Sequence, residues 1–185
     1  QKSGMVFAMD PDQQGKTLWS ARAGMGGYNG GIHWGMASNG ETLFVGIADT
    51  PGHHMTVGPP RHGVHAFDVA TGEAIWSTIE DKLCDTSDTR CFPSASAPVT
   101  ATEDLVFAGG LDAVMRVYSA ESGERVWSYD TLRDFETVNG VPAFGGSIDS
   151  AGPVLIDDKL LINSGYDKFR LLPGNTLLVF ELAEE

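Results

Sequence analysis

Hydrophobic residues occur along the chain in short runs that are separated by glycine and polar turn residues. The runs are rich in β-branched and aromatic side chains, which favours strands over helices. One stretch of the sequence shows four such runs in succession. We expect four strands there, at residues 97–101, 105–109, 115–118 and 125–129. Almost no helix is expected, so the pattern predicts an all-β fold of short antiparallel strands.

A short sequence motif occurs three times and shows that the strands belong to a repeated unit. In each copy a glycine precedes a tryptophan by four residues, as in Gly72 and Trp76. The tryptophans are Trp19, Trp76 and Trp127, which lie 57 and 51 residues apart. Repeats of roughly 40 to 50 residues are typical of four-stranded β-propeller blades. A fourth copy begins at residues 179–182, so residues 1–185 are expected to form about three and a half blades of one propeller domain.

The repeated glycine and tryptophan have a predicted structural role. The glycine is expected to take a positive φ in the turn between the third and fourth strands, where a Cβ atom would be strained. The tryptophan is expected to pack against the neighbouring blade rather than to bind a cofactor. Three and a half blades cannot close a ring, so we expect the remaining blades in a longer parent chain.

Charge and composition exclude two kinds of partner. The formal net charge is −13, and no basic stripe is present to neutralise phosphates, so no nucleic acid is expected. No run approaches the roughly 20 apolar residues that span a bilayer. The chain starts at Gln1, just before an apolar run, which is typical of a segment taken from a longer protein. Cys84 and Cys91 form either a local disulfide or two unpaired thiols.

Loop lengths predict which face of the propeller carries function. The connections between blades are long, as are two of the connections between second and third strands, and these lie on one face. The inner ends of the connections between blades are rich in glycine and small polar residues, and they point toward the propeller axis. A planar, anionic ligand with several carbonyl groups fits this inventory. The candidate cofactor-binding residues are His33, Trp34, Ser96, Asn139, Gly146 and Ser147.

Three segments of this face also resemble a known family. Residues 31–37, the Cys84–Cys91 loop with residues 94–97, and residues 133–140 with 145–149 look like the C-terminal half of the polyvinyl alcohol dehydrogenase group of quinoproteins. The resemblance implies an eight-bladed propeller in the bacterial periplasm that binds pyrroloquinoline quinone (PQQ), commonly with Ca²⁺. It also implies oxidation of secondary alcohols, including polymeric ones, by hydride transfer to PQQ, with electrons passed to cytochrome c. A carboxylate takes the alcohol proton in such enzymes, and Asp149 is the local candidate.

Each candidate residue has a structural alternative. His33 could be a loop histidine bonded to a backbone carbonyl, Trp34 could be a core residue, and Asp149 could cap a turn. Asp112 is expected to be a turn residue. A transition-metal site is a further hypothesis, with ligands from Asp49, His53, His54 and His62.

A function other than catalysis also fits the predicted propeller. A non-catalytic propeller of the outer-membrane assembly-factor type would use the same face to bind proteins. A scaffold does not need glycines that let the backbone approach the propeller axis, so these glycines favour the enzyme. Because the other blades are missing, the segment alone is expected to be inactive.

Overall fold

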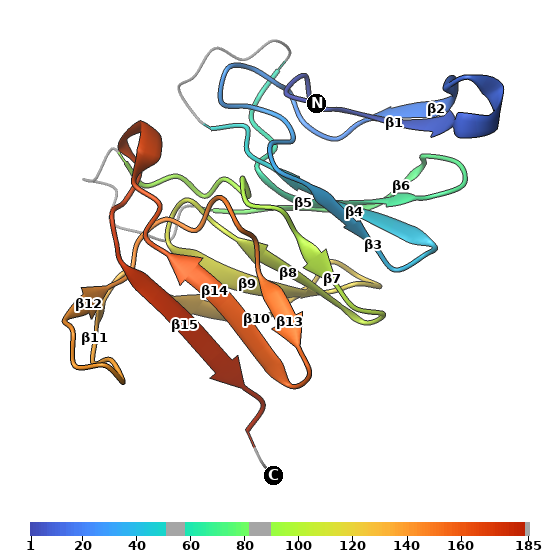
Figure 1. Ribbon diagram of the computed structural model, residues 1–185. Helices are drawn as coiled ribbons and strands as arrows, with labels where there is room; N and C mark the ends of the chain where they lie inside the picture. The colour runs from blue at the N-terminus through green and yellow to red at the C-terminus, as the bar shows by residue number, and fades with distance from the viewer. Residues whose placement is uncertain (51–57, 82–89, 184–185) are drawn as a thin grey trace.

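The computed structural model describes residues 1–50, 58–81 and 90–183, whose regular secondary structure is almost entirely antiparallel β-strand (Figure 1). Two short 3₁₀ turns, Pro11–Gln13 and Lys168–Arg170, interrupt the strands. No helix in these ranges is long and apolar enough to cross a membrane. The predicted all-β class is therefore confirmed.

The strands form consecutive sheets that follow one another along the chain, as blades of a propeller do (Figure 1). The first blade contains β1 (Met5–Asp10) and β2 (Lys16–Arg22). The second blade contains β3 (Met36–Ser38), β4 (Thr42–Ile47), β5 (Gly63–Asp68) and β6 (Ala74–Ile79). The third contains β7 (Thr100–Ala101), β8 (Leu105–Gly109), β9 (Val114–Ser119) and β10 (Arg125–Asp130). The fourth contains β13 (Val154–Ile156), β14 (Lys159–Ser164) and β15 (Thr176–Glu181).

Two of the sheets are complete four-stranded blades, and their strand order follows the sequence. The third blade matches the four strands that the sequence predicts, except that its first strand is shorter. Residues 97–99 precede β7 without ladder pairing. A small hairpin of β11 (Asp134–Phe135) and β12 (Ala143–Phe144) lies in the connection between the third and fourth blades.

Hydrophobic side chains fill the space between consecutive blades, because each strand directs alternate residues to opposite faces of its sheet. Phe44 and Val64 of the second blade lie in one cluster with Val106 and Tyr118 of the third. Equivalent clusters join the first blade to the second and the third to the fourth. The core is therefore divided into layers, one at each interface between blades.

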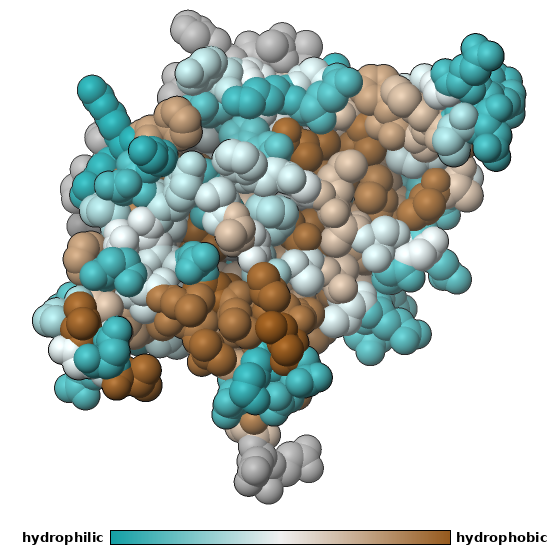
Figure 2. All heavy atoms as spheres, viewed as in Figure 1, coloured by the Kyte–Doolittle hydropathy of each residue, from teal (hydrophilic) through white to brown (hydrophobic). Residues whose placement is uncertain are grey.

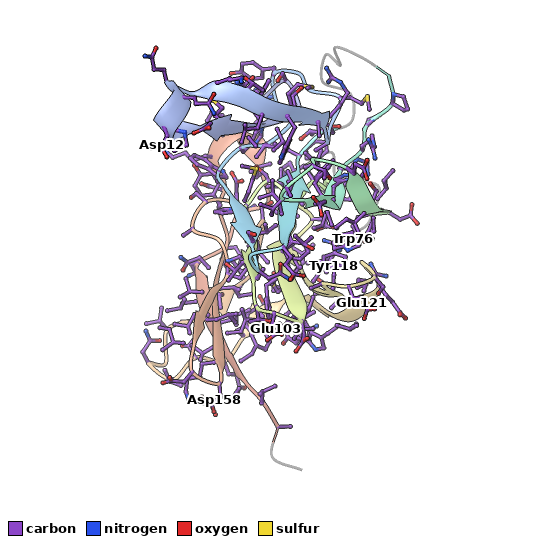
Figure 3. All side chains as sticks on the ribbon, turned by 90° about the vertical axis from the view of Figure 1, so that its right-hand side faces the viewer. Asp12, Trp76, Glu103, Tyr118, Glu121 and Asp158 are labelled. Carbon is purple, nitrogen blue, oxygen red and sulfur yellow. The ribbon has the colours of Figure 1, made fainter. Side chains whose placement is uncertain are left out.

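The repeated glycine and tryptophan meet at these interfaces. Gly72 and Gly123 adopt φ angles of 75° and 72°, as predicted. Trp76 packs on the turn of the following blade, which includes Glu121 (Figure 3). Its Nε1 donates to the Ala120 carbonyl at 2.9 Å. A Cβ atom on Gly123 would lie 2.5 Å from Cε3 of Trp76. The glycine is thus required twice, for its backbone conformation and because an indole ring covers it.

The fourth blade exposes the apolar face that a further blade would cover in a closed ring. Val154, Ile156, Leu177 and Val179 are each about half exposed. They belong to the brown area over β13 and β15 in Figure 2. An area of this kind accords with the prediction that other blades complete the propeller.

Buried charges join the second and third blades. Glu80 accepts hydrogen bonds from the Tyr118 hydroxyl and from Arg125, both at 2.8 Å, and its carboxylate lies 3.2 Å from Nε of Arg116. Arg116 also pairs with Asp112, and these two side chains are almost fully buried. Asp112 is the turn residue that the sequence predicts, and in addition it neutralises a buried arginine.

Candidate functional site

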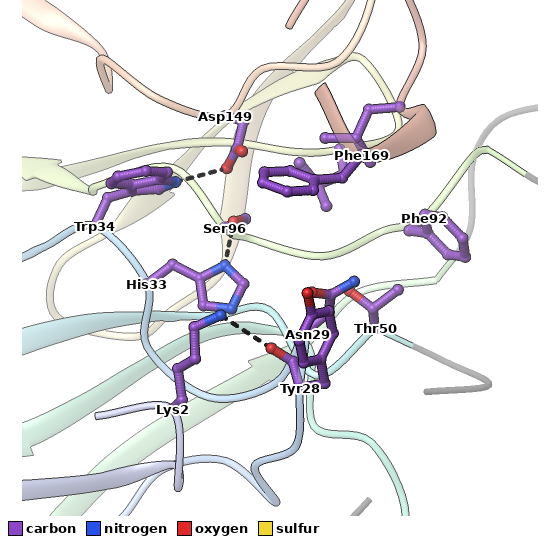
Figure 4. A pocket seen from close by; sticks show the side chains of 12 residues that line it. Lys2, Tyr28, Asn29, His33, Trp34, Thr50, Phe92, Ser96, Asp149 and Phe169 are labelled. Carbon is purple, nitrogen blue, oxygen red and sulfur yellow. Dashed lines mark hydrogen bonds between the residues drawn. The ribbon is translucent and has the colours of Figure 1, made fainter. Parts of the chain in front are cut away.

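A pocket of about 270 Å³ lies where the connections between blades reach the inner strands (Figure 4). His33 and Trp34 precede β3, Ser96 precedes β7, and Asp149 precedes β13, so these four residues come from three blades. The other lining residues are Lys2, Tyr28, Asn29, Thr50, Phe92, Leu111, Phe169 and Leu171. The structure thus brings together four of the seven residues that the sequence nominates.

His33 and Ser96 hold two of these connections together. Nδ1 of His33 lies 2.7 Å from the Ser96 hydroxyl, so the partner of this histidine is a side chain of the next blade. Burial lowers the pKa of His33 from its usual value, and the charge of Lys2 lowers it further, while the negative charge of Asp149 opposes the shift. The ring is therefore neutral at pH 7. Its Nε2 is buried and meets no hydrogen-bond partner in the part of the chain that the structure describes.

Trp34 and Asp149 join the second blade to the fourth. The indole Nε1 donates to Oδ1 of Asp149 at 3.0 Å, across 115 positions of sequence. Trp34 is 53% exposed, whereas Asp149 is 5% exposed. A core tryptophan would be far more buried, so the indole is available as a flat surface at the pocket. The Asp149 carboxylate is turned toward the pocket and Trp34.

Ser147 and Gly146 lie beneath the pocket wall. The Ser147 hydroxyl donates to the Leu111 carbonyl at 2.6 Å and accepts from the Leu172 amide at 3.0 Å. A Cβ atom on Gly146 would lie 2.1 Å from the Pro173 carbonyl oxygen, so this glycine permits a close approach of two backbone segments. Neither residue lines the pocket, and their predicted contact with a cofactor stays a prediction.

Asn139 is also outside the pocket. It lies in the exposed turn between β11 and β12, where its side-chain oxygen accepts from the Thr137 hydroxyl at 2.7 Å and from the Val141 amide at 3.1 Å. These bonds stabilise the turn of the hairpin. The hairpin holds Asn139 apart from the residues that line the pocket, and its cofactor contact likewise stays a prediction.

Several lining residues were missed by the sequence analysis. Tyr28 and Asn29 directly precede the Gly30–Gly31 pair, and this position next to a nominated segment could have revealed them. Lys2 carried no signal, yet it is the cation of the pocket wall and donates to the Tyr28 carbonyl at 3.0 Å. Phe169 reaches the pocket from the loop between β14 and β15, far from any nominated segment.

The hypothesis of a transition-metal site finds no ligand set in the described residues. The Asp49 carboxylate is fully buried and accepts hydrogen bonds from the amides of Met25, Gly26, Gly31 and Arg61. Its oxygens are therefore occupied in fixing the surrounding loops. His62 is bonded to the Glu80 carbonyl at 2.8 Å. His53 and His54 lie outside the described residues, as does Cys84, so the disulfide with Cys91 stays a prediction.

Comparisons with known proteins identify the type of propeller. The PQQ_2 family model, described as outer membrane protein assembly factor BamB, matches residues 2–152. A polyvinylalcohol dehydrogenase from a Pseudomonas species is 34% identical over 98% of this chain, but the chain spans only 29% of that relative. BamB from Moraxella catarrhalis superposes with a TM-score of 0.56 at 18% identity, covering 99% of this chain and 48% of that one.

A quinohemoprotein alcohol dehydrogenase from Comamonas testosteroni superposes with a TM-score of 0.53 at 18% identity, covering 87% of this chain and 26% of that one. The two solved structures share the fold with this chain. The family model matches most of the chain, and the repeated blades agree with it. The chain therefore belongs to the PQQ-type β-propeller family.

Proposed function

We propose that this chain is part of a PQQ-dependent alcohol dehydrogenase and supplies a wall of its cofactor and substrate pocket. The observation that carries the proposal is the convergence of His33, Trp34, Ser96 and Asp149 on one pocket at the inner ends of three blades. The similarity to a polyvinylalcohol dehydrogenase along nearly the whole chain supports the same conclusion.

The lining residues fit a planar, anionic cofactor. Trp34 offers an exposed aromatic face for stacking, and Lys2 offers a positive charge. The buried Nε2 of His33 has an unused capacity for a hydrogen bond in the described residues, and Asn29 adds an amide. Bound PQQ would supply the acceptor for the hydride of the alcohol.

The chain's own residues would bind and deprotonate the alcohol. The Asp149 carboxylate is the proposed acceptor of the hydroxyl proton, because it is the carboxylate among the residues that line the pocket. The hydrogen bond from Trp34 uses one side of this carboxylate and fixes its direction. The neutral His33 would orient groups in the pocket without competing for the proton.

The finer features of the proposal extend beyond this chain. We place the parent protein in the bacterial periplasm, with secondary alcohols, including polymeric ones, as substrates and cytochrome c as electron acceptor. Ca²⁺ is expected from the resemblance, but no group of acidic, histidine or cysteine side chains in the described ranges is arranged to hold it.

A protein-binding scaffold is the competing function. The family model described as BamB and the superposition on BamB from Moraxella catarrhalis favour it. A scaffold, however, has no requirement for a carboxylate and an indole that face a common pocket.

Titration of the full-length protein with PQQ, in the presence of Ca²⁺, tests the proposal. Binding is followed by quenching of tryptophan fluorescence, and turnover by dye-linked oxidation of 2-propanol. Trp34→Ala is expected to weaken PQQ binding about tenfold through loss of a stacking face. Asp149→Asn is expected to lower kcat by roughly 10²- to 10⁴-fold and to leave PQQ binding nearly unchanged.

Asp12→Asn is the matched control, because Asp12 is exposed in a turn of the first blade. This variant is expected to bind and turn over like the unchanged protein. If the unchanged protein neither binds PQQ nor oxidises the alcohol, the dehydrogenase proposal is refuted and the protein-binding scaffold is the remaining function.

A further inference from the structure

Phe169 lies in the loop between β14 and β15 and is, with Tyr28 and Trp34, one of the exposed aromatic residues that line the pocket. It is 75% exposed, yet it lines the pocket that contains Asp149. In the view of Figure 4, the Asp149 carboxylate lies between the indole of Trp34 and the ring of Phe169. Phe92 and Leu171 line the same pocket. Apolar side chains therefore form part of the pocket wall, and the one beside Asp149 in this view, Phe169, is largely accessible to a ligand.

The backbone that carries Phe169 is strained. Phe169 and Arg170 adopt φ angles of 60° and 64°, which places two consecutive residues with side chains in the left-handed region. This conformation costs free energy at each residue, and it is most unusual for a bulky side chain. Strain of this kind concentrates at functional sites, where the surrounding structure holds it.

Ser147 provides the contacts that hold this loop. Its carbonyl accepts from the amides of Gly165 and Tyr166 at 3.0 and 2.9 Å, where the loop begins. Its amide donates to the Leu172 carbonyl at 2.9 Å, and its hydroxyl accepts from the Leu172 amide at 3.0 Å, where the loop ends. Because Ser147 is two residues before Asp149, one short segment fixes both the carboxylate and the loop that presents Phe169.

We infer that Phe169, with Phe92 and Leu171, forms an apolar subsite that binds the carbon chain of the alcohol next to Asp149. The inference rests on the proposed function, since Asp149 is taken as the group that faces the hydroxyl. The substrate class that fits is a secondary alcohol with an extended alkyl chain, whose hydroxyl faces the carboxylate while its chain lies against the rings.

The subsite is tested with the full-length, PQQ-loaded protein and the series 2-propanol, 2-butanol, 2-hexanol and 2-octanol. Each methylene that is buried against the subsite is expected to raise kcat/KM by up to about fourfold. Phe169→Ala is expected to reduce the preference for 2-hexanol over 2-propanol roughly tenfold, and Phe169→Leu should lose less because it keeps apolar bulk. Both variants should fold, because the side chain is largely exposed.

Phe144→Ala is the matched control, because Phe144 is a partly exposed phenylalanine of β12 that does not line the pocket. A second readout is binding of the product ketone 2-octanone by calorimetry, which needs no turnover. Phe169→Ala should weaken this binding roughly tenfold, in parallel with the kinetics.

Equal chain-length dependence in the unchanged protein and in Phe169→Ala, with equal ketone affinity, would overturn the subsite. Failure of the unchanged protein to oxidise any of the alcohols would instead refute the proposed function. In that case the ketone affinities still decide whether Phe169 binds alkyl chains.

Discussion

Replacement of Gly123 by alanine measures how strongly one blade is docked on the next. An alanine at φ 72° carries left-handed strain of about 1 kcal/mol. Its Cβ would also lie 2.5 Å from Cε3 and 2.6 Å from Cδ2 of Trp76, so the indole must move. Movement of the ring weakens the 2.9 Å hydrogen bond from Trp76 to the Ala120 carbonyl, which is worth about 1 kcal/mol, and loosens its packing by a similar amount. The expected total is about 3 kcal/mol.

Gly140 supplies an internal control for this prediction. It lies in the turn between β11 and β12 with nearly the same backbone conformation, φ 71°, but no atom lies within 4 Å of the position of a Cβ. Gly140→Ala should therefore cost only the strain, about 1 kcal/mol. The two variants are compared by equilibrium unfolding in urea, monitored by tryptophan fluorescence. Equal destabilisation in both would refute the argument that the indole requires a glycine beneath it.

Two further predictions concern buried polar groups. Burial lowers the pKa of His65 to about 4, so its ring is neutral in the folded state at pH values where the unfolded chain, with a pKa near 6.5, becomes protonated. The free energy of unfolding should not depend on this residue above pH 6.5, and it should fall by about 3 kcal/mol as the pH drops from 6.5 to 4. The measurement is urea unfolding at several pH values, with His65→Asn as the control. A pH dependence identical in the two proteins would contradict this. Glu80→Gln should cost about 3 kcal/mol because it leaves Arg116 without one of its buried counter-charges, whereas the exposed Glu103→Gln should cost almost nothing. Similar unfolding free energies for these two variants would show that the network is not stabilising.

The repeated blades could be predicted because their signals are local. The glycine of each turn and the tryptophan four residues later follow from backbone geometry and from the need of a sheet to cover its face. The second role of Gly123, beneath Trp76, was not predicted. It depends on a contact between two residues that are 47 positions apart and belong to different copies of the repeat, so no local sequence pattern contains it.

The pocket was predictable only in part. His33, Trp34, Ser96 and Asp149 were found because each lies in a segment that leads into the first strand of a blade, and the start of that strand is expected near the axis. Ser147 belongs to such a segment too, but its hydroxyl and backbone are bonded to the loop that ends at Leu172. Which residue of a segment faces the ligand depends on these tertiary contacts.

Other participants carried no signal in the sequence. Phe169 stands in the loop between β14 and β15, and the strained backbone of that loop, which Ser147 holds at both ends, directs it to the pocket. Arg116 looked like any residue of a strand, although it is the centre of a buried ionic network. Asn139 stood in the motif that carried the resemblance, yet a hairpin holds it away from the pocket.

The contact between a tryptophan and the next turn also has a direction. Trp19 donates to the Val69 carbonyl and Trp76 to the Ala120 carbonyl, so each blade reaches forward to its successor in the chain. Every complete repeat carries both halves of the joint, an indole at its end and a glycine turn to receive one. Duplication or loss of a whole repeat in a gene therefore leaves matching joints on either side, and this is a physical route by which propellers with different numbers of blades can evolve from one ancestor.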